Sequence, residues 1–202
     1  MEEQSEYEYT VKLIILGDSG VGKSNIILRY IDNKFCEIYL LTPGMDVKKT
    51  TVNLKGRKIR VQLWDTAGQE KYKSMTRNLL VKVQGFLLVY DITNKESFNN
   101  LGSWIKTIRD ECGTLVPIII VGNKSDLENG RSISKNQAME FARNEKVEYI
   151  ETSSKSGENI TKAINMLVLK VLDSATFIND CSFALDDSSA LNIRKRHKCC
   201  SK

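Results

Sequence analysis

The chain has 202 residues, of which 41% are hydrophobic and 27% charged. This length suits one globular domain with a tail, and this composition excludes wholesale disorder. The net charge of +5 is accounted for by the basic C-terminal run of Arg194, Lys195, Arg196, Lys198 and Lys202. The rest is balanced, unlike a nucleic-acid-binding domain, which spreads basic charge over a face.

Scattered cysteines and a single histidine argue against a secreted disulfide framework and a His-based metal site. We therefore expect a reducing, cytoplasmic environment. No apolar run reaches the ~18–20 residues that a membrane span needs. The first residues predict neither a secretory signal nor N-myristoylation.

Strand patterns alternate with helical patterns along the chain. Strands are predicted at 11–16, on either side of Lys55-Gly56-Arg57 within 45–64, and at 86–90, 116–121 and 147–152. Helices are predicted at 22–32, 95–110, 134–144 and 158–172. This order indicates an α/β fold with a mostly parallel sheet.

Three regions are expected along the chain. Residues 1–8 form a short extension, 9–174 the folded domain and 175–202 a flexible tail, because the helical pattern weakens after Asp173. Phe177, Ile178 and Phe183 could still dock on the domain.

The segment Gly17–Ser24 matches the phosphate-binding pattern GxxxxGK[ST] and lies between a predicted strand and a predicted helix. Its backbone N–H groups and the helix N-terminus attract phosphate oxygens. Lys23 would reach the β- and γ-phosphates, and the Ser24 hydroxyl could bind Mg²⁺. The predicted phosphate-binding residues are Asp18, Ser19, Gly20, Val21, Gly22, Lys23 and Ser24.

Two later motifs predict the base and the reaction. Asp126 of Asn123-Lys124-Ser125-Asp126 can accept hydrogen bonds from guanine N1–H and the exocyclic amine, which adenine does not offer. Asn123 would join loops, and the stem of Lys124 could lie along the base. In 65–69, Asp65 suits support of Mg²⁺, the Gly68 N–H could meet the γ-phosphate, and Gln69 could orient the attacking water.

Together with Glu151-Thr-Ser-Ser-Lys155, these motifs make the sequence resemble a Ras-superfamily small GTPase from Tyr9 to Asp173. Tyr90-Asp-Ile-Thr93, the 151–155 motif and the paired C-terminal cysteines resemble the Rab branch most. The resemblance implies the P-loop NTPase fold of small G proteins, with a six-stranded mostly parallel sheet flanked by helices.

The resemblance also implies further site residues. Phe35 falls where relatives stack an aromatic ring on guanine, although a core phenylalanine is the alternative. Thr42 falls at the switch I threonine, a Mg²⁺ ligand when GTP is bound. Switch I would span 36–46 and switch II 66–80. The loop after the last strand would meet the guanine carbonyl through Ser153, Ser154 and Lys155.

Some positions depart from the Rab pattern. Pro43 follows Thr42, Val47 replaces an aromatic residue, and Leu79-Leu80 replaces two tyrosines. The nucleotide-binding motifs are retained, whereas the surface read by partners is altered. These departures leave open a nucleotide-locked adaptor that binds GTP or GDP with little hydrolysis.

The C-terminal Cys199 and Cys200 could both be geranylgeranylated in the Rab manner, and two lipids anchor stably. The basic run would add attraction to an anionic membrane. A solvated, unlipidated end, a nuclear-localisation signal and a zinc site with Cys181 and His197 are the alternatives.

The resemblance implies a slow GTPase that acts as a switch in vesicle-mediated transport. Expected partners are GTP and GDP, an exchange factor, a GAP, effectors, and prenylation and extraction chaperones, with no nucleic acid. The protein would attach reversibly to the cytosolic face of an organelle membrane.

Overall fold

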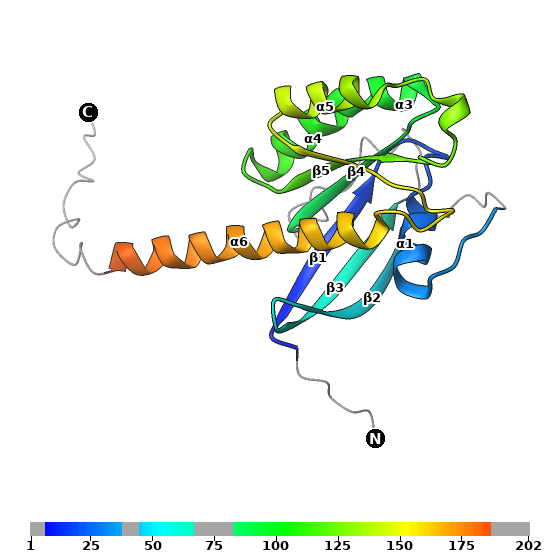
Figure 1. The fold of residues 1–202 in the computed structure, drawn as a ribbon. Helices are drawn as coiled ribbons and strands as arrows, with labels where there is room; N and C mark the ends of the chain where they lie inside the picture. The colour runs from blue at the N-terminus through cyan, green and yellow to red at the C-terminus, as the bar shows by residue number, and fades with distance from the viewer. Residues whose placement is uncertain (1–6, 38–44, 67–82, 187–202) are drawn as a thin grey trace, which may run out of the picture.

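The computed structural model describes residues 7–37, 45–66 and 83–186, with the backbone alone for 45 and 175–186. A six-stranded sheet forms its centre, with helices on both faces (Figure 1). The strands are β1 (Tyr9–Leu16), β2 (Met45–Leu54), β3 (Arg57–Thr66), β4 (Gly85–Asp91), β5 (Ile118–Asn123) and β6 (Glu148–Glu151). The helices are α1 (Lys23–Asp32), α3 (Lys95–Asn99), α4 (Leu101–Cys112), α5 (Lys135–Asn144) and α6 (Ile160–Asp186), with a 3-10 turn at Glu128–Gly130.

The strand order is β2-β3-β1-β4-β5-β6, and β2 alone runs antiparallel to its neighbour. The fold class predicted from the sequence is therefore confirmed. The β2–β3 hairpin turns at Lys55 and Gly56, as the sequence predicts.

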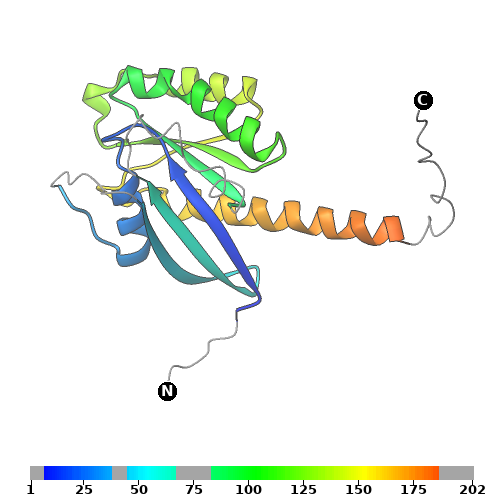
Figure 2. The same cartoon turned by 180° about the vertical axis from the view of Figure 1, so that it is seen from behind.

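Alternation along β1 divides the core into two layers. Val11, Leu13 and Ile15 pack with α1 and α6 on one face of the sheet. Ile14 and Leu16 pack with α3, α4 and α5 on the other face. Figures 1 and 2 show the two helical layers from opposite sides.

Two helical predictions need correction. The helix predicted at 95–110 is two helices, because the chain breaks at Asn100 between α3 and α4. The last helix continues to Asp186 instead of ending near 172, and it projects well beyond the sheet (Figure 1). No glycine or proline interrupts residues 158–186, so nothing local stops the helix. The expected flexible tail of 175–202 thus begins with helical backbone.

The sheet topology places several loops at one edge. The order reverses around β1, and the loops after β1, β4, β5 and β6 leave the carboxyl ends of parallel strands. Ligands of open α/β sheets bind at such an edge. Among the described residues, no helix has the length and apolarity to cross a membrane.

Candidate nucleotide-binding site

The loop between β1 and α1 has a shape that requires glycine at both ends. Gly17 and Gly22 have φ angles of 137° and 101°, which L side chains rarely adopt. A Cβ on Gly17 would also overlap the Val89 carbonyl, and one on Gly22 would overlap the Asn123 amide. The loop therefore packs closely against β4 and β5.

Lys23 closes this loop from inside. Its Nζ donates hydrogen bonds to the carbonyl oxygens of Gly17 at 2.8 Å and Asp18 at 2.6 Å. Burial lowers the pKa of Lys23 to about 8, against the opposite influence of the Asp65 and Asp18 carboxylates. An incoming anion would stabilise the charged form of this buried ammonium.

Asn123 joins three loops from the end of β5. Its side chain is fully buried, and its Nδ2 donates to the Val21 carbonyl at 2.9 Å. Its Oδ1 accepts from the Ser154 backbone N–H and the Thr152 hydroxyl, both at 3.2 Å. One amide thus holds the phosphate loop against both candidate base-binding loops.

The two candidate base-binding loops also contact each other. The Ser153 hydroxyl donates to Asp126 Oδ1 at 2.5 Å, and Ser125 N–H donates to the Thr152 carbonyl at 3.0 Å. Lys124 pairs with Asp91 at the end of β4. Asp126 itself is exposed, so its carboxylate is accessible to a ligand. The hydrogen bond from Ser153 orients that carboxylate.

Phe35 lies on a segment that is tied to this region. Lys155 pairs with Glu37 at 3.6 Å, and Asn25 exchanges two hydrogen bonds of 3.0 Å with the Cys36 backbone. Phe35 is half-buried and belongs to neither core layer. This placement argues against the alternative of a core phenylalanine.

Asp65 at the end of β3 is a buried carboxylate with an unused oxygen. Its Oδ1 makes no hydrogen bond within the described residues. Burial raises the pKa of Asp65, while a hydrogen bond from Ser24 and the Lys23 ammonium oppose that shift. A carboxylate and a hydroxyl are oxygen ligands of the kind that Mg²⁺ prefers, so Asp65 and Ser24 fit the ion.

Several predicted residues lie outside the described residues: Thr42, Gly68, Gln69, Cys199 and Cys200, together with Pro43 and Leu79-Leu80. Val47 is described, and it lies opposite Trp64 in the β2–β3 pair.

A polar network beneath the base-binding loops was missed in the sequence. The Tyr149 hydroxyl donates to Glu151 Oε1 at 2.7 Å and lies 3.0 Å from the fully buried Tyr90 hydroxyl. Arg131 donates to both Glu151 oxygens, at 2.8 and 3.1 Å. The glycine at position 122 is the sequence feature that could have indicated this network, since a Cβ there would contact both tyrosine hydroxyls.

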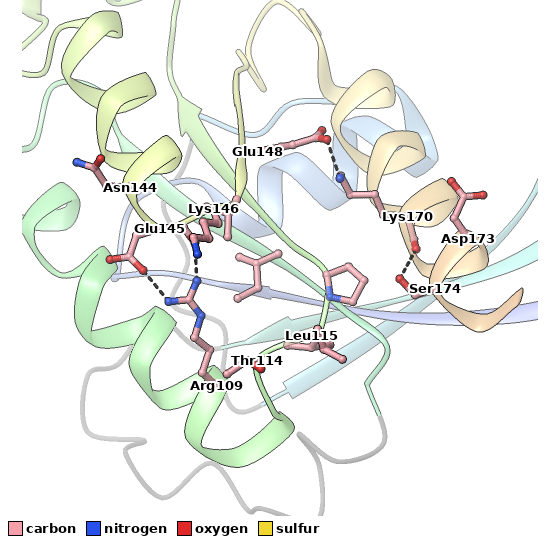
Figure 3. Close-up of a pocket in the computed structure, with 14 residues that line it drawn as sticks. Arg109, Thr114, Leu115, Asn144, Glu145, Lys146, Glu148, Lys170, Asp173 and Ser174 are labelled. Atoms are coloured by element: carbon pink, nitrogen blue, oxygen red, sulfur yellow. Dashed lines mark hydrogen bonds and ion pairs between the residues drawn. The ribbon is translucent and has the colours of Figure 1, made fainter. Parts of the chain in front are cut away.

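A pocket of about 680 Å³ lies at the opposite end of the sheet, where β5 and β6 begin (Figure 3). Its rim carries two ion pairs, Arg109–Glu145 at 2.7 Å and Lys170–Glu148 at 2.6 Å. It contains none of the predicted site residues. The site predicted from the sequence is therefore separate from this pocket.

Comparison with known proteins agrees with this geometry. Residues 12–173 match the model of the Ras family. Rab-13 of Canis lupus familiaris is 40% identical over 82% of both chains, and Rab-10 of Diplobatis ommata is 36% identical over 96% of this chain and 98% of its own. RABE1e of Arabidopsis thaliana is 40% identical over 78% of this chain and 72% of its own. The chain therefore belongs to the Ras family, as a small GTPase of the Rab type.

Proposed function

We propose that this protein is a switch in vesicle-mediated transport that alternates between GTP and GDP forms and hydrolyses GTP slowly. The main support is the Asn123 side chain, which holds the phosphate loop and both base-binding loops in one place. Its matches among Rab proteins extend over most of the chain.

Each part of the nucleotide has its own set of residues in this proposal. The phosphates bind the backbone of Asp18–Ser24, the Lys23 ammonium and the Gly68 N–H. Guanine is read by Asp126, stacks against Phe35 and contacts Lys124 and the backbone of Ser153–Lys155. Ser24, Thr42 and Asp65 hold Mg²⁺, which neutralises phosphate charge when bound.

Hydrolysis requires a water that is oriented for attack, and we assign this role to Gln69. A family member of the Ras kind is slow by itself, and a GAP accelerates it by roughly 10⁵-fold, largely through a transition-state arginine. We therefore expect GAP-stimulated turnover and nucleotide exchange by a separate factor.

Membrane attachment through Cys199 and Cys200 is the second part of the proposal. Two lipids anchor stably where one is marginal, and the nearby basic run would strengthen binding to an anionic leaflet. Intact mass after expression in a eukaryotic host tests this, because each lipid adds a fixed mass. An unmodified mass would indicate a lipid-free GTPase.

A nucleotide-locked adaptor remains the alternative function. Pro43, next to Thr42, favours it because proline restricts the preceding residue and removes a backbone N–H. Such a protein would hold GTP or GDP without turnover.

Single-turnover hydrolysis separates these two functions. The full chain is loaded with GTP and Mg²⁺, and GDP formation is followed by chromatography in wild type, Gln69→Leu and the exposed control Gln137→Leu. Slow turnover that only Gln69→Leu abolishes would support the switch. Stable GTP in all three proteins, even with a GAP, would support the adaptor.

A further inference from the structure

A carboxylate occupies an unexpected place in the phosphate-binding loop. Asp18 lies between Gly17 and Ser19, in a loop whose N–H groups and helix N-terminus favour anions. A negative side chain directed into such a loop would repel phosphate. Asp18 is only 7% exposed, so the fold must hold its charge in a defined place.

Two side chains at the start of α4, from its N-cap and its first turn, hold both oxygens of Asp18. Trp104 Nε1 donates to Asp18 Oδ1 at 3.1 Å, and Asn100 Nδ2 donates to Asp18 Oδ2 at 2.7 Å. The Asp18 carbonyl accepts from Lys23 at 2.6 Å. Side chain and backbone of Asp18 are thus fixed by different partners, with the carboxylate turned to α4.

The placement of Asn100 supports a dedicated role. Asn100 and Trp104 are four residues apart, the spacing that puts two side chains on one helix face. Asn100 occupies the N-cap of α4 but makes no side-chain cap bond. Asn94 and Ser134 do cap α3 and α5. The Asn100 amide is directed to Asp18 instead.

We propose that Asn100 and Trp104 are positioning residues for phosphate binding. They hold the Asp18 carboxylate against α4 and so keep its charge out of the phosphate-binding loop. Loss of either donor releases that charge toward the bound phosphates. This inference rests on the proposed nucleotide site.

Release of a fluorescent GDP from the full chain in Mg²⁺ tests the proposal. Hydrogen bonds to charged groups are the stronger ones, so Trp104→Phe and Asn100→Leu should each accelerate release about tenfold. Trp64→Phe is the matched control, since the Trp64 indole N–H has no hydrogen-bond partner among the described residues. The control should stay within about twofold of wild type, a difference well below 1 kcal/mol.

Removal of the charge separates positioning from packing. If Trp104 acts by holding the carboxylate, adding Asp18→Ala to Trp104→Phe should return GDP release to within about threefold of wild type, because no stranded charge remains. A tryptophan that only packs against the loop would not be rescued in this way. The same rescue is expected for Asn100→Leu, which covers the case in which Trp104→Phe does not fold.

The outcomes distinguish failure of the positioning role from failure of the proposed nucleotide site. Wild-type release rates in both single variants would overturn the positioning role and leave the nucleotide site intact. Accelerated release without rescue by Asp18→Ala would mean that these residues act by packing against the loop and not by holding the carboxylate. If wild type itself binds no GDP, the nucleotide site and this inference both fail.

Discussion

Polar side chains are buried at one end of the sheet and largely exposed at the other. The carboxyl ends of the strands and the loops and helix starts around them hold the buried polar and charged residues of the described chain: Asp18, Lys23, Asp65, Thr66, Asp91, Ser97, Asn123, Thr152, Ser153 and Ser154. At the other end, the pocket is bordered by ion pairs such as Lys170–Glu148, whose side chains are 39% and 46% exposed.

This difference is the one expected between a binding site and an ordinary surface. Burying a polar group costs free energy unless it is hydrogen-bonded. The carboxyl end of the sheet, which we call the nucleotide end after the proposed function, is therefore stable only because side chains such as Asn123 satisfy several loops at once. Such groups are already oriented when a ligand arrives. Exposed ion pairs cost and contribute little, and they orient nothing for a ligand.

The largest expected effect comes from Asp126, the carboxylate that we propose to read the base. Asp126→Asn should lower the GDP-to-ADP affinity ratio by about 10³-fold, because two charge-assisted hydrogen bonds to guanine are lost. Equilibrium competition between the two nucleotides measures this ratio. Asp110→Asn makes the same chemical change on an exposed part of α4 and should leave the ratio unchanged. Undiminished discrimination in Asp126→Asn would mean that another group reads the base.

Close packing at the nucleotide end predicts a loss of stability in Gly22→Ala. The added Cβ meets the Asn123 amide and the φ angle of 101° is unfavourable for alanine, so unfolding free energy should fall by about 2 kcal/mol. Gly102→Ala in α4 is the control, because nothing lies near its Cβ. Chemical denaturation compares the two. Equal unfolding free energies of the two variants would show that the phosphate-binding loop can move away from Asn123 at no cost in stability.

The buried tyrosine pair predicts a dependence on alkaline pH. Burial raises the pKa of Tyr90 to about 12 and also raises the pKa of Tyr149. Because both pKa values are higher in the folded state than the value near 10 in the unfolded state, the two tyrosines contribute their full stability below pH ~10. That stability is lost as the pH rises above it. Between pH ~10 and ~11, the unfolding free energy of wild type should fall by about 1–2 kcal/mol more than that of the double variant Tyr90→Phe/Tyr149→Phe.

Denaturation at several alkaline pH values checks this difference in slope. Tyr9→Phe is the control, since Tyr9 is 43% exposed, and its slope should match that of wild type. A double variant as alkali-sensitive as wild type would contradict the assignment.

The smallest effect is expected at the pocket. Glu148→Gln breaks the exposed pair with Lys170 and should change unfolding free energy by no more than about 0.5 kcal/mol. GDP release should not change, because the pair lies at the far end of β6 from the base-binding loops. Faster release would reveal an energetic coupling between the two ends of the sheet.

Local patterns in the sequence determined much of this molecule. The alternation of strands and helices identified the fold class, and the Gly17–Ser24 and Asn123–Asp126 motifs predicted which loops form the nucleotide site. Both inferences depend on residues close together in the chain, where spacing determines geometry. Helix ends were less certain, as the break at Asn100 and the extension of α6 to Asp186 demonstrate.

Tertiary structure alone decided which distant side chains support the site. Asp18 and Asn100 are 82 positions apart, and Tyr90 and Tyr149 are 59 apart, so no local spacing connects them. Each pair forms because parallel strands and their crossover helices bring remote segments to one edge of the sheet. Burial then favours a partner for each polar group at that edge, and the choice of partner depends on packing across the whole domain.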